Sequence, residues 1–572
     1  MCGVAGVIGA EADVGAMIAA LAHRGPDGAR VEHGPNRTLA HARLSIIDLA
    51  GGWQPLHAAG STVVGNGEIY NYVELAAEFG LGDRMATGSD FEPLLHLYAQ
   101  EGPAAFDRLR GMYAFCLAGA DGRVWLVRDP FGIKPLYVAR CGAGWAFASE
   151  PRAFFAAGLL QPALAEEGAR ELLGLNYVLG EATGFAGVRR IAPGAIVEVR
   201  DGELVAHGRR EALAPSTGSW SPSPRCGGWG AATDDGLIGE LDAVLEDSIR
   251  VHQRSDVPYG LFLSGGADSA AIATVMARLA ARPVTAFTCG FAAPGAADER
   301  RQAEGVARAL NLDWRETAFD ETDFWRLIPK AAWALDDPTA DYAVLPTLKL
   351  AEAAQGTLTV VLTGEGGDEL FGGYGRYRRA LRPAWLGGRP AEPRPDEPEV
   401  LARWRLAAKA PAGLSRLQAA QYGDIATWLP GDLLTKLDRC LMTFGLEGRT
   451  PFLDPEVAAF AFGLPDRFKL RGRQGKWLLR AWLARTCPQA APWARKQGFT
   501  VPVDAWIAPR SQDIAVRVAR VAAVARLRSP EAVRAAFATP GRRWPLLFFA
   551  VWALIHLEGA DPDDALAAVA GA

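Results

Sequence analysis

The sequence predicts a two-domain protein, with a β-rich N-terminal half and a C-terminal α/β half that is built on a parallel sheet and ends in helices. The chain has 572 residues, too many for one hydrophobic core and enough for about two to four domains. Short β-type runs separated by turn residues dominate the first half, whereas apolar runs alternate with helical segments in the second. These two patterns separate the halves.

Residues 38–150 of the N-terminal half carry the β signals. The runs TLAHARLSIID and STVVGNGEIY alternate in part, as half-buried strands do. The segment MYAFCLAGADGRVWLVRD predicts a hairpin with its turn at Asp121 and Gly122. A second hairpin is expected in KPLYVARCGAGWAFAS, turning at residues 142–144.

A segment rich in Pro, Gly and Ser at 206–232 predicts the linker between the halves. The domains are therefore placed at 1–205 and 233–572. In the second domain, YGLFLSGG precedes the helical DSAAIATVMARLAA, PVTAFTCGF precedes ERRQAEGVARALN, and a further strand is expected in LTVVLTGEGGDE. Residues 400–572 look helical, and the Pro-rich stretch 382–399 predicts a surface loop.

Composition indicates a globular protein of a reducing cytoplasm. With 60 basic and 65 acidic residues the net charge is −5, which does not favour nucleic acid as a partner. The seven cysteines are widely spaced and lack a C-x-x-C pair, against both a disulfide framework and a zinc site. No Lys or Arg precedes the first apolar stretch, so no secretory signal is expected. The apolar run 544–557 is shorter than the roughly 18 residues of a membrane span and predicts a buried helix.

The first glycine-rich loop, in GLFLSGGADSAAIA, is a candidate phosphate site. Ser264, Gly265 and Gly266 follow a strand, and a helix is expected to begin near Asp268 and Ser269. Glycines allow close backbone approach, and the free N–H groups of a helix start attract anions. No Gly-Lys-Ser/Thr follows, so the loop is not a Walker A motif and chemistry at the α-phosphate is favoured.

A second loop, LTGEGGDELFGGY, also ends a strand and carries acidic residues. Because the carboxyl ends of parallel strands meet at one edge of a sheet, both loops should face the same ligand. Asp268 and Asp368 could then share Mg²⁺ with a pyrophosphate group, since that ion prefers oxygen ligands. The sequence thus predicts a nucleotide site with a metal ion.

Cys2 directly follows the initiator methionine, which admits three readings: chance, a lipidation signal, or a nucleophile exposed by removal of Met1. Membrane attachment through Cys2 or 544–557 is disfavoured, because one acyl chain anchors only marginally. An N-terminal cysteine would carry its own α-amine, whose pKa of about 7.7–8.0 suits an internal base.

Eleven motifs in order make the chain resemble the glutamine-dependent asparagine synthetase family. They read MCGVAGV, AHRGPDG, ARLSIID, GNGEIYN, TGSD, RDPFGIKPLY, SGGADS, LTGEGGDELFGGY, DRCLMTFGLEGRTPFLD, GKWLLR and RKQGFTVPVDAW. The resemblance implies an N-terminal-nucleophile (Ntn) hydrolase sandwich of layers α/β/β/α with antiparallel sheets, followed by an ATP-pyrophosphatase domain of the adenine nucleotide α-hydrolase type. It also implies a dry channel for ammonia between the two sites and is compatible with a homodimer.

For the glutaminase half, the resemblance implies that Cys2 attacks glutamine while Asn66 and the backbone N–H of Gly67 bind the oxyanion. The charged groups of the substrate would be held by Arg43, Glu68 and Asp90. Glutamine would give glutamate and ammonia.

For the synthetase half, the resemblance implies that ATP and a carboxylate form an acyl-adenylate, from which ammonia displaces AMP. Glu365 would lie beside the intermediate, and Lys476 would neutralise charge during the transfer. The implied ATP-binding residues are Leu263, Ser264, Gly265, Gly266, Asp268, Ser269, Cys289, Thr363 and Gly364, with Asp268 and Asp368 as metal ligands.

Three positions depart from the family pattern. Ala267 stands where a larger aliphatic residue is frequent, Thr363 where a serine is common, and Gly448 where an alanine is usual. Ala267 and Gly448 could enlarge the site and admit an acid other than aspartate, which leaves amidotransfer to another carboxylate in secondary metabolism or envelope polysaccharide assembly as an alternative. Ring-closing relatives and a nucleotide-binding scaffold without catalysis are further alternatives. The presence of Cys2, Asn66 and Asp90 argues against the ring-closing relatives.

Overall fold

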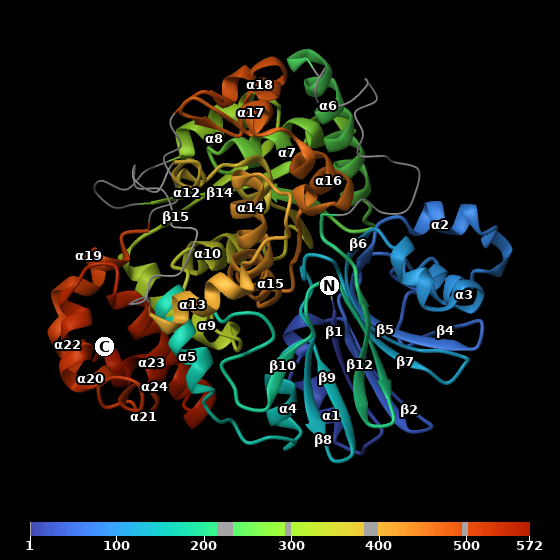
Figure 1. Ribbon diagram of the computed structural model, residues 1–572, viewed down its shortest axis with the longest axis horizontal. Coiled ribbons are helices and arrows are strands. Elements are labelled where there is room, and N and C mark those ends of the chain that lie inside the picture. Colours follow the sequence, from blue (N-terminus) through green and yellow to red (C-terminus); the bar gives the residue numbers. More distant parts are fainter. Residues whose placement is uncertain (1, 214–232, 292–298, 383–397, 495–500, 572) are drawn as a thin grey trace.

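The protein is described from a computed structural model (Figure 1). The description covers residues 2–213, 233–291, 299–382, 398–494 and 501–571. Residues 214–232 of the predicted linker and nearly all of the Pro-rich stretch 382–399 lie outside these residues.

The N-terminal half contains two antiparallel sheets, as the sequence predicts. The first has the order β10 (Val188–Arg190), β8 (Tyr137–Cys141), β9 (Gly144–Ala148), β1 (Gly3–Ile8), β3 (Arg37–Arg43) and β2 (Gly28–Gly34). The second has the order β12 (Glu203–Arg209), β11 (Ala195–Arg200), β7 (Val124–Arg128), β6 (Gly111–Ala118), β5 (Ser61–Ile69) and β4 (Leu56–Ala58). Both expected hairpins are present, as β6–β7 and β8–β9.

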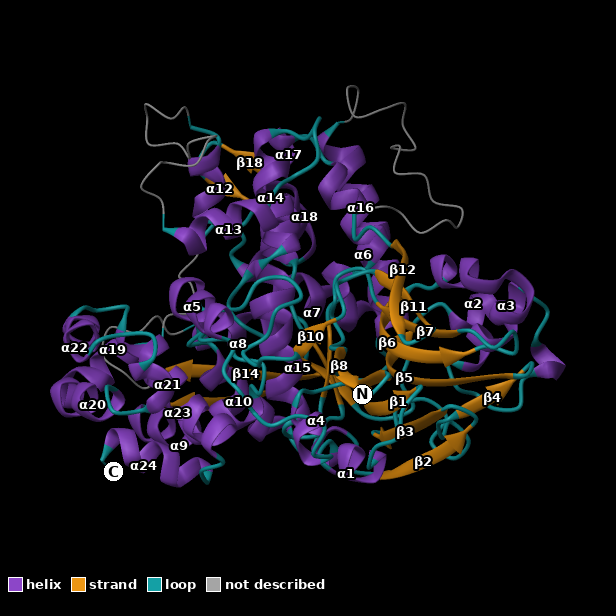
Figure 2. Ribbon diagram, turned by 60° about the horizontal axis from the view of Figure 1, so that its bottom comes forward, coloured by secondary structure: helices purple, strands orange, loops and turns teal. Residues whose placement is uncertain are grey.

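The two sheets pack face to face, with helices on their outer faces (Figure 2). Strand β1 shows why: Val4 and Ile8 enter the core between the sheets, whereas Ala5 and Val7 face the helices. The first sheet is covered by α1 (Val14–Ala19) and α4 (Arg152–Ala156), and the second by α2 (Tyr72–Glu78) and α3 (Glu92–Glu101). Helix α5 (Glu166–Leu175) leads toward the second half. Strand β12 runs to Arg209, so the predicted boundary at 205 falls inside a strand.

The C-terminal half is built on a parallel sheet, which confirms the predicted alternation of strands and helices. Its order is β15 (Asp313–Phe319), β14 (Thr285–Phe291), β13 (Tyr259–Phe262), β16 (Val360–Leu362) and β17 (Glu447–Arg449). The helices that follow or cover these strands are α6 (Asp234–His252), α7 (Ala267–Leu279), α8 (Arg300–Ala309), α9 (Glu321–Ala334), α10 (Val344–Ala354), α11 (Gly367–Phe371) and α12 (Gly375–Ala380).

The rest of the chain is mainly helical, as predicted. It comprises α13 (Glu399–Ala407), α14 (Arg416–Ala426), α15 (Leu434–Met442), α16 (Pro455–Gly463), α17 (Asp466–Lys469), a short hairpin of β18 (Leu470–Arg471) and β19 (Gln474–Gly475), α18 (Trp477–Thr486), α19 (Val503–Ile507), α20 (Ser511–Val518), α21 (Ala522–Ala525), α22 (Pro530–Ala538), α23 (Arg543–Glu558) and α24 (Pro562–Ala570). The apolar run 544–557 forms the buried helix α23, as expected. Among the described residues, no helix has the length and apolar character needed to cross a bilayer.

The two halves share a buried interface. Two apolar clusters contain side chains of both halves; in one of them Phe185 and Trp552 meet with ring centroids 5.1 Å apart. Charged groups are buried there as well: Arg24 donates to both carboxylate oxygens of Asp438 at 2.8 and 3.1 Å, and also to Glu150 at 2.8 Å. Helix α15, which carries Asp438, is therefore fastened to the N-terminal half.

Replacement of Asp438 by Asn should destabilise this interface strongly. The substitution removes the negative charge that faces the fully buried Arg24, and the loss of one partner of a buried ion pair costs about 3–5 kcal/mol. The free energy of unfolding, followed by tryptophan fluorescence in a denaturant titration, measures the effect. Asp234→Asn is the matched control, because its pair with Arg471 is exposed and should contribute less than about 1 kcal/mol. Equal losses in the two variants would contradict this reading of the interface.

Candidate functional site

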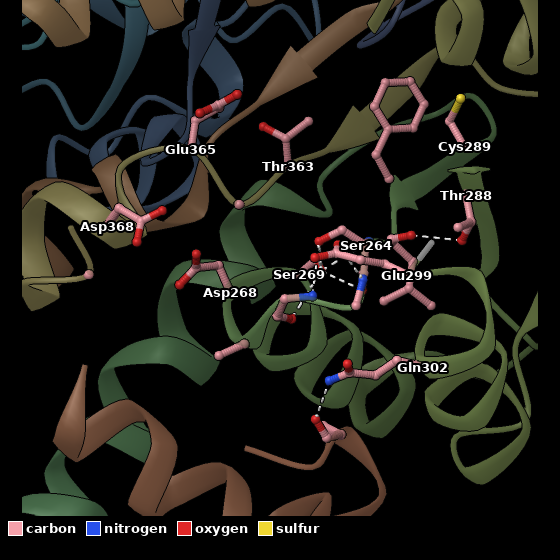
Figure 3. Close-up of a pocket in the computed structure, with 18 of the residues that line it drawn as sticks. Ser264, Asp268, Ser269, Thr288, Cys289, Glu299, Gln302, Thr363, Glu365 and Asp368 are labelled. Atoms are coloured by element: carbon pink, nitrogen blue, oxygen red, sulfur yellow. Dashed lines mark hydrogen bonds between the residues drawn. The ribbon is translucent and has the colours of Figure 1, made fainter. Parts of the chain in front are cut away.

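A cavity of about 330 Å³ opens where the loops after β13 and β16 meet, at the carboxyl edge of the parallel sheet (Figure 3). All nine residues predicted to bind ATP line it. Glu365, Asp368 and Lys476 line it as well. The structure thus gathers one complete set of predicted residues, which come from distant segments of the chain, into a single pocket.

The first loop is shaped by hydrogen bonds between its own serines. The Ser269 hydroxyl accepts from the backbone N–H of Ser264 at 3.1 Å and lies 2.9 Å from the Ser264 hydroxyl. Gly266 donates its N–H to the Ser264 hydroxyl at 3.1 Å, and helix α7 begins at the next residue. The loop therefore presents a helix start toward the pocket, as expected of a phosphate site.

The second loop brings Asp368 next to Asp268, and Lys476 lies between them. The Lys476 ammonium is 2.6 Å from Asp368 and also contacts Asp268. Burial opposes the charged form, but the two carboxylates together raise the pKa of Lys476. Lys476 has φ of 54° and ψ of 37°, a left-handed conformation that is costly for a residue with a side chain. A buried lysine that is held between two carboxylates, with a costly backbone conformation, is consistent with a functional site.

Glycines allow these groups to approach one another. A Cβ atom on Gly373 would lie 1.7 Å from Asp368 and 2.2 Å from the Lys476 side chain. A Cβ on Gly367 would lie 2.6 Å from an Asp268 carboxylate oxygen. The glycines of the second loop therefore make room for the acidic residues and the lysine.

Several pocket residues were not found from the sequence. Glu299 accepts the N–H of Gly265 at 3.1 Å, and Lys436 and Arg480 line the pocket from distant helices. Lys436 binds Asp341 at 2.8 Å, and burial raises the pKa of Glu365, which the charge of Lys436 partly offsets. A lysine or arginine of an amphipathic helix resembles any surface cation in sequence, so no local signal could have identified these two.

Gly448 does not open space in the way the sequence suggested. A Cβ at this position of β17 would lie 3.1 Å from Leu437 and 3.1 Å from Leu441. The leucines of α15 fill the volume, so the expectation that Gly448 enlarges the site is wrong. Ala267 does line the pocket.

A second group of predicted residues surrounds Cys2, which is buried at the start of β1. Its backbone N–H donates to the Asn66 side-chain oxygen at 3.0 Å, and its thiol donates to the carbonyl of Leu44 at 3.8 Å. Burial raises the pKa of the Cys2 thiol, although nearby positive charge opposes the shift. A thiol in this environment needs a base in the site to become a nucleophile.

Asn66 and Gly67 lie on β5, next to Cys2. The Asn66 side-chain nitrogen is buried and finds no hydrogen-bond partner among the described residues. Gly67 has φ of 134°, and a Cβ there would lie 2.0 Å from the Met112 carbonyl oxygen, so only glycine fits. An unsatisfied buried donor beside a thiol suits the binding of an oxyanion.

The predicted charged residues of this site are buried and fixed by the surrounding backbone. Arg43 donates to the carbonyls of Leu49 at 3.2 Å and Asp48 at 2.6 Å, which holds the adjacent loop. Asp90 accepts the N–H of Ile69, the residue that follows Glu68 on β5, at 2.8 Å.

Burial raises the pKa of Asp90 to about 7, and it raises the pKa of Glu68 well above its usual range. Two buried carboxylates with raised pKa values mark a place that favours a cationic group.

Comparison with known proteins gives matches over both halves. The family described as "Asparagine synthase" matches residues 240–556, and the family described as "Glutamine amidotransferase domain" matches residues 1–208. A Mycobacterium tuberculosis protein provisionally named asparagine synthetase [glutamine-hydrolyzing] is 33% identical, with 98% of each chain covered. Asparagine synthetase [glutamine-hydrolyzing] 1 of Bacillus subtilis is 32% identical, covering 85% of this chain and 83% of that one. Asparagine synthetase B [glutamine-hydrolyzing] of Escherichia coli is 29% identical, covering 85% and 78%.

Gly373→Ala should impair the pocket. The added methyl group would displace Asp368 and Lys476, and such overpacking costs about 1–3 kcal/mol. We expect the dissociation constant for ATP, measured by calorimetry, to rise about tenfold. Gly375→Ala is the matched control, because its Cβ would meet nothing closer than Arg378 at 3.7 Å. Unchanged binding by Gly373→Ala would show that nucleotide does not use this arrangement.

Proposed function

The chain belongs to the asparagine synthase family, and on that premise we propose that it makes asparagine from aspartate, with glutamine as nitrogen donor and ATP as the activating nucleotide. The observation that supports the proposal is that one chain brings together two separate groups of predicted residues. One surrounds the buried Cys2, and the other lies at the carboxyl edge of the parallel sheet. The layers of the N-terminal half fit an Ntn hydrolase, and the loops of the C-terminal half fit an ATP-pyrophosphatase.

In the N-terminal half, removal of Met1 would leave Cys2 with a free α-amine. The amine takes the thiol proton, and the Cys2 sulfur attacks the side-chain carbonyl carbon of glutamine. The Asn66 amide and the Gly67 N–H bind the oxyanion, while Arg43, Glu68 and Asp90 hold the charged end of the substrate. The α-ammonium returns the proton to the leaving nitrogen, so that collapse of the tetrahedral intermediate releases ammonia, and water then hydrolyses the thioester to glutamate.

In the C-terminal half, an oxygen of the aspartate β-carboxylate attacks the α-phosphorus of ATP, and pyrophosphate leaves. Ammonia then attacks the carbonyl carbon of the acyl-adenylate, and AMP leaves. The loop Ser264–Ser269 holds the phosphates. Lys476 neutralises the negative charge that develops on the leaving groups. Glu365 lies beside the acyl group. The ammonia crosses between the sites through the buried interface.

Mg²⁺ fits the donor set of the pocket. Asp268 and Asp368 converge on one ammonium group, so the space between them accepts positive charge. No cluster of three or more His, Cys, Asp or Glu side chains suited to a metal occurs among the described residues. Asp268 and Asp368 would hold the ion together with water and the phosphates of the substrate. When bound, Mg²⁺ would neutralise the pyrophosphate oxygens.

Cys2→Ala separates the two activities. The variant should lose asparagine formation with glutamine and keep it with free ammonia, because only the first route needs the thiol. Asparagine and glutamate are measured by chromatography with MgATP and aspartate present. Equal loss with both nitrogen donors would refute the division into two sites.

The identity of the acceptor is tested directly by product analysis. With aspartate, glutamine and MgATP, we expect asparagine, AMP and pyrophosphate in equal amounts, and no AMP when the acid is omitted. A panel of other carboxylic acids provides the comparison. Release of AMP with another acid, and no asparagine from aspartate, would support the amidotransfer chemistry but reject aspartate as the acceptor.

A further inference from the structure

Strand β17 belongs to the synthetase sheet, yet it directs two charged side chains toward the glutaminase site. Arg449, fully buried, lies 3.2 Å from Glu68 of β5. On the basis of the proposed glutaminase activity, we infer that Arg449 is a positioning residue of the glutamine site, which the N-terminal half does not complete alone.

The guanidinium of Arg449 is fixed by contacts on all its nitrogens. Its Nε donates to Glu447 at 2.6 Å, and Nη1 donates to the carbonyls of His252 at 2.8 Å and Arg254 at 2.7 Å. The remaining nitrogen, Nη2, faces Glu68. A planar group held on two sides has a defined direction, which a flexible lysine ammonium could not reproduce.

Through the same contacts, Arg449 orders the segment that follows α6, and this segment docks onto the glutaminase half. Asp256 donates its N–H to the carbonyl of Ile46 at 2.9 Å, and its carboxylate accepts the N–H of Asp48 at 2.8 Å. Asp48 and its neighbours form the loop whose carbonyls bind Arg43. Arg449 therefore supports both the acidic and the basic side of the predicted glutamine site.

Arg449 also supplies positive charge where buried carboxylates accumulate. Asp90, Glu447 and Tyr72, as well as Arg449, interact electrostatically with Glu68. Burial raises the pKa of Glu68, Asp90 adds to the shift, and Arg449 opposes it. Arg449 likewise opposes the raised pKa of Asp90. Without Arg449 the carboxylates would take up protons at higher pH and lose the charge that binds the substrate ammonium.

The experiment measures glutamine binding by calorimetry in the full-length Cys2→Ala protein, which cannot turn glutamine over, across the neutral pH range. Arg449→Met should weaken binding about tenfold or more at neutral pH, because it leaves buried carboxylates without their partner. The defect should shrink as pH rises and the carboxylates ionise again. Arg449→Lys keeps the charge, so its pH dependence should stay closer to that of the parent.

Two further measurements distinguish a positioning role of Arg449 from a general effect of its replacement on folding. Ammonia-dependent asparagine formation should change less than about threefold in both variants, because the synthetase pocket keeps its side chains. Addition of Glu68→Gln to Arg449→Met should cost less than the sum of the single losses, since the two residues act together. Arg471→Met, which removes an exposed arginine, is the matched control.

A loss that is independent of pH and equal in Arg449→Met and Arg449→Lys would overturn the inference, as would additive losses with Glu68→Gln. If the protein with intact Cys2 hydrolyses glutamine and Arg449→Met binds it normally, the inference alone fails. If the intact protein neither binds nor hydrolyses glutamine, the proposed glutaminase activity fails, and the inference fails with it.

Discussion

The burial of charged side chains between the two halves is the constraint on which both sites depend. Arg24 contacts Asp438 across the interface and also donates to the carbonyl of Cys2 at 3.3 Å. Such groups tolerate burial only when paired in good geometry, so the halves must meet in one register. Helix α15 carries Asp438, which binds Arg24 beside Cys2, and it also carries Lys436 and Leu437, which line the other pocket. A single helix thereby connects the two sites.

Local signals were sufficient for most of the elements and for the two glycine-rich loops of the pocket, whereas the other residues of both sites were assigned by the family resemblance. The loops at Ser264 and Gly364 follow buried strands, and the rule that parallel strands end at one edge was enough to place them together. The hairpins were readable because turn residues separate alternating runs. Strand β12 extended past the expected boundary because its pairing with β11, rather than local composition, decides where it ends.

Contacts between the halves could not be predicted in the same way. Arg24 and Asp438 are 414 positions apart, and each alone looks like an ordinary surface charge. Arg449 stands in a motif noticed in the sequence, but its meaning depends on Glu68, which the fold brings from the other half. The error at Gly448 has the same origin, because only the packing of α15 shows that leucines fill the space beside it.

Arg449 also connects the sites through its backbone. Its carbonyl accepts the N–H of Thr363, which lines the nucleotide pocket, at 2.9 Å, while its side chain faces Glu68. Contact alone does not create coupling, because a ligand shifts an equilibrium only by its different affinity for two states. If nucleotide moves Thr363, the displacement reaches the glutamine site through one residue. If nucleotide thereby changes the affinity for glutamine by some factor, thermodynamic linkage requires glutamine to change the affinity for nucleotide by the same factor.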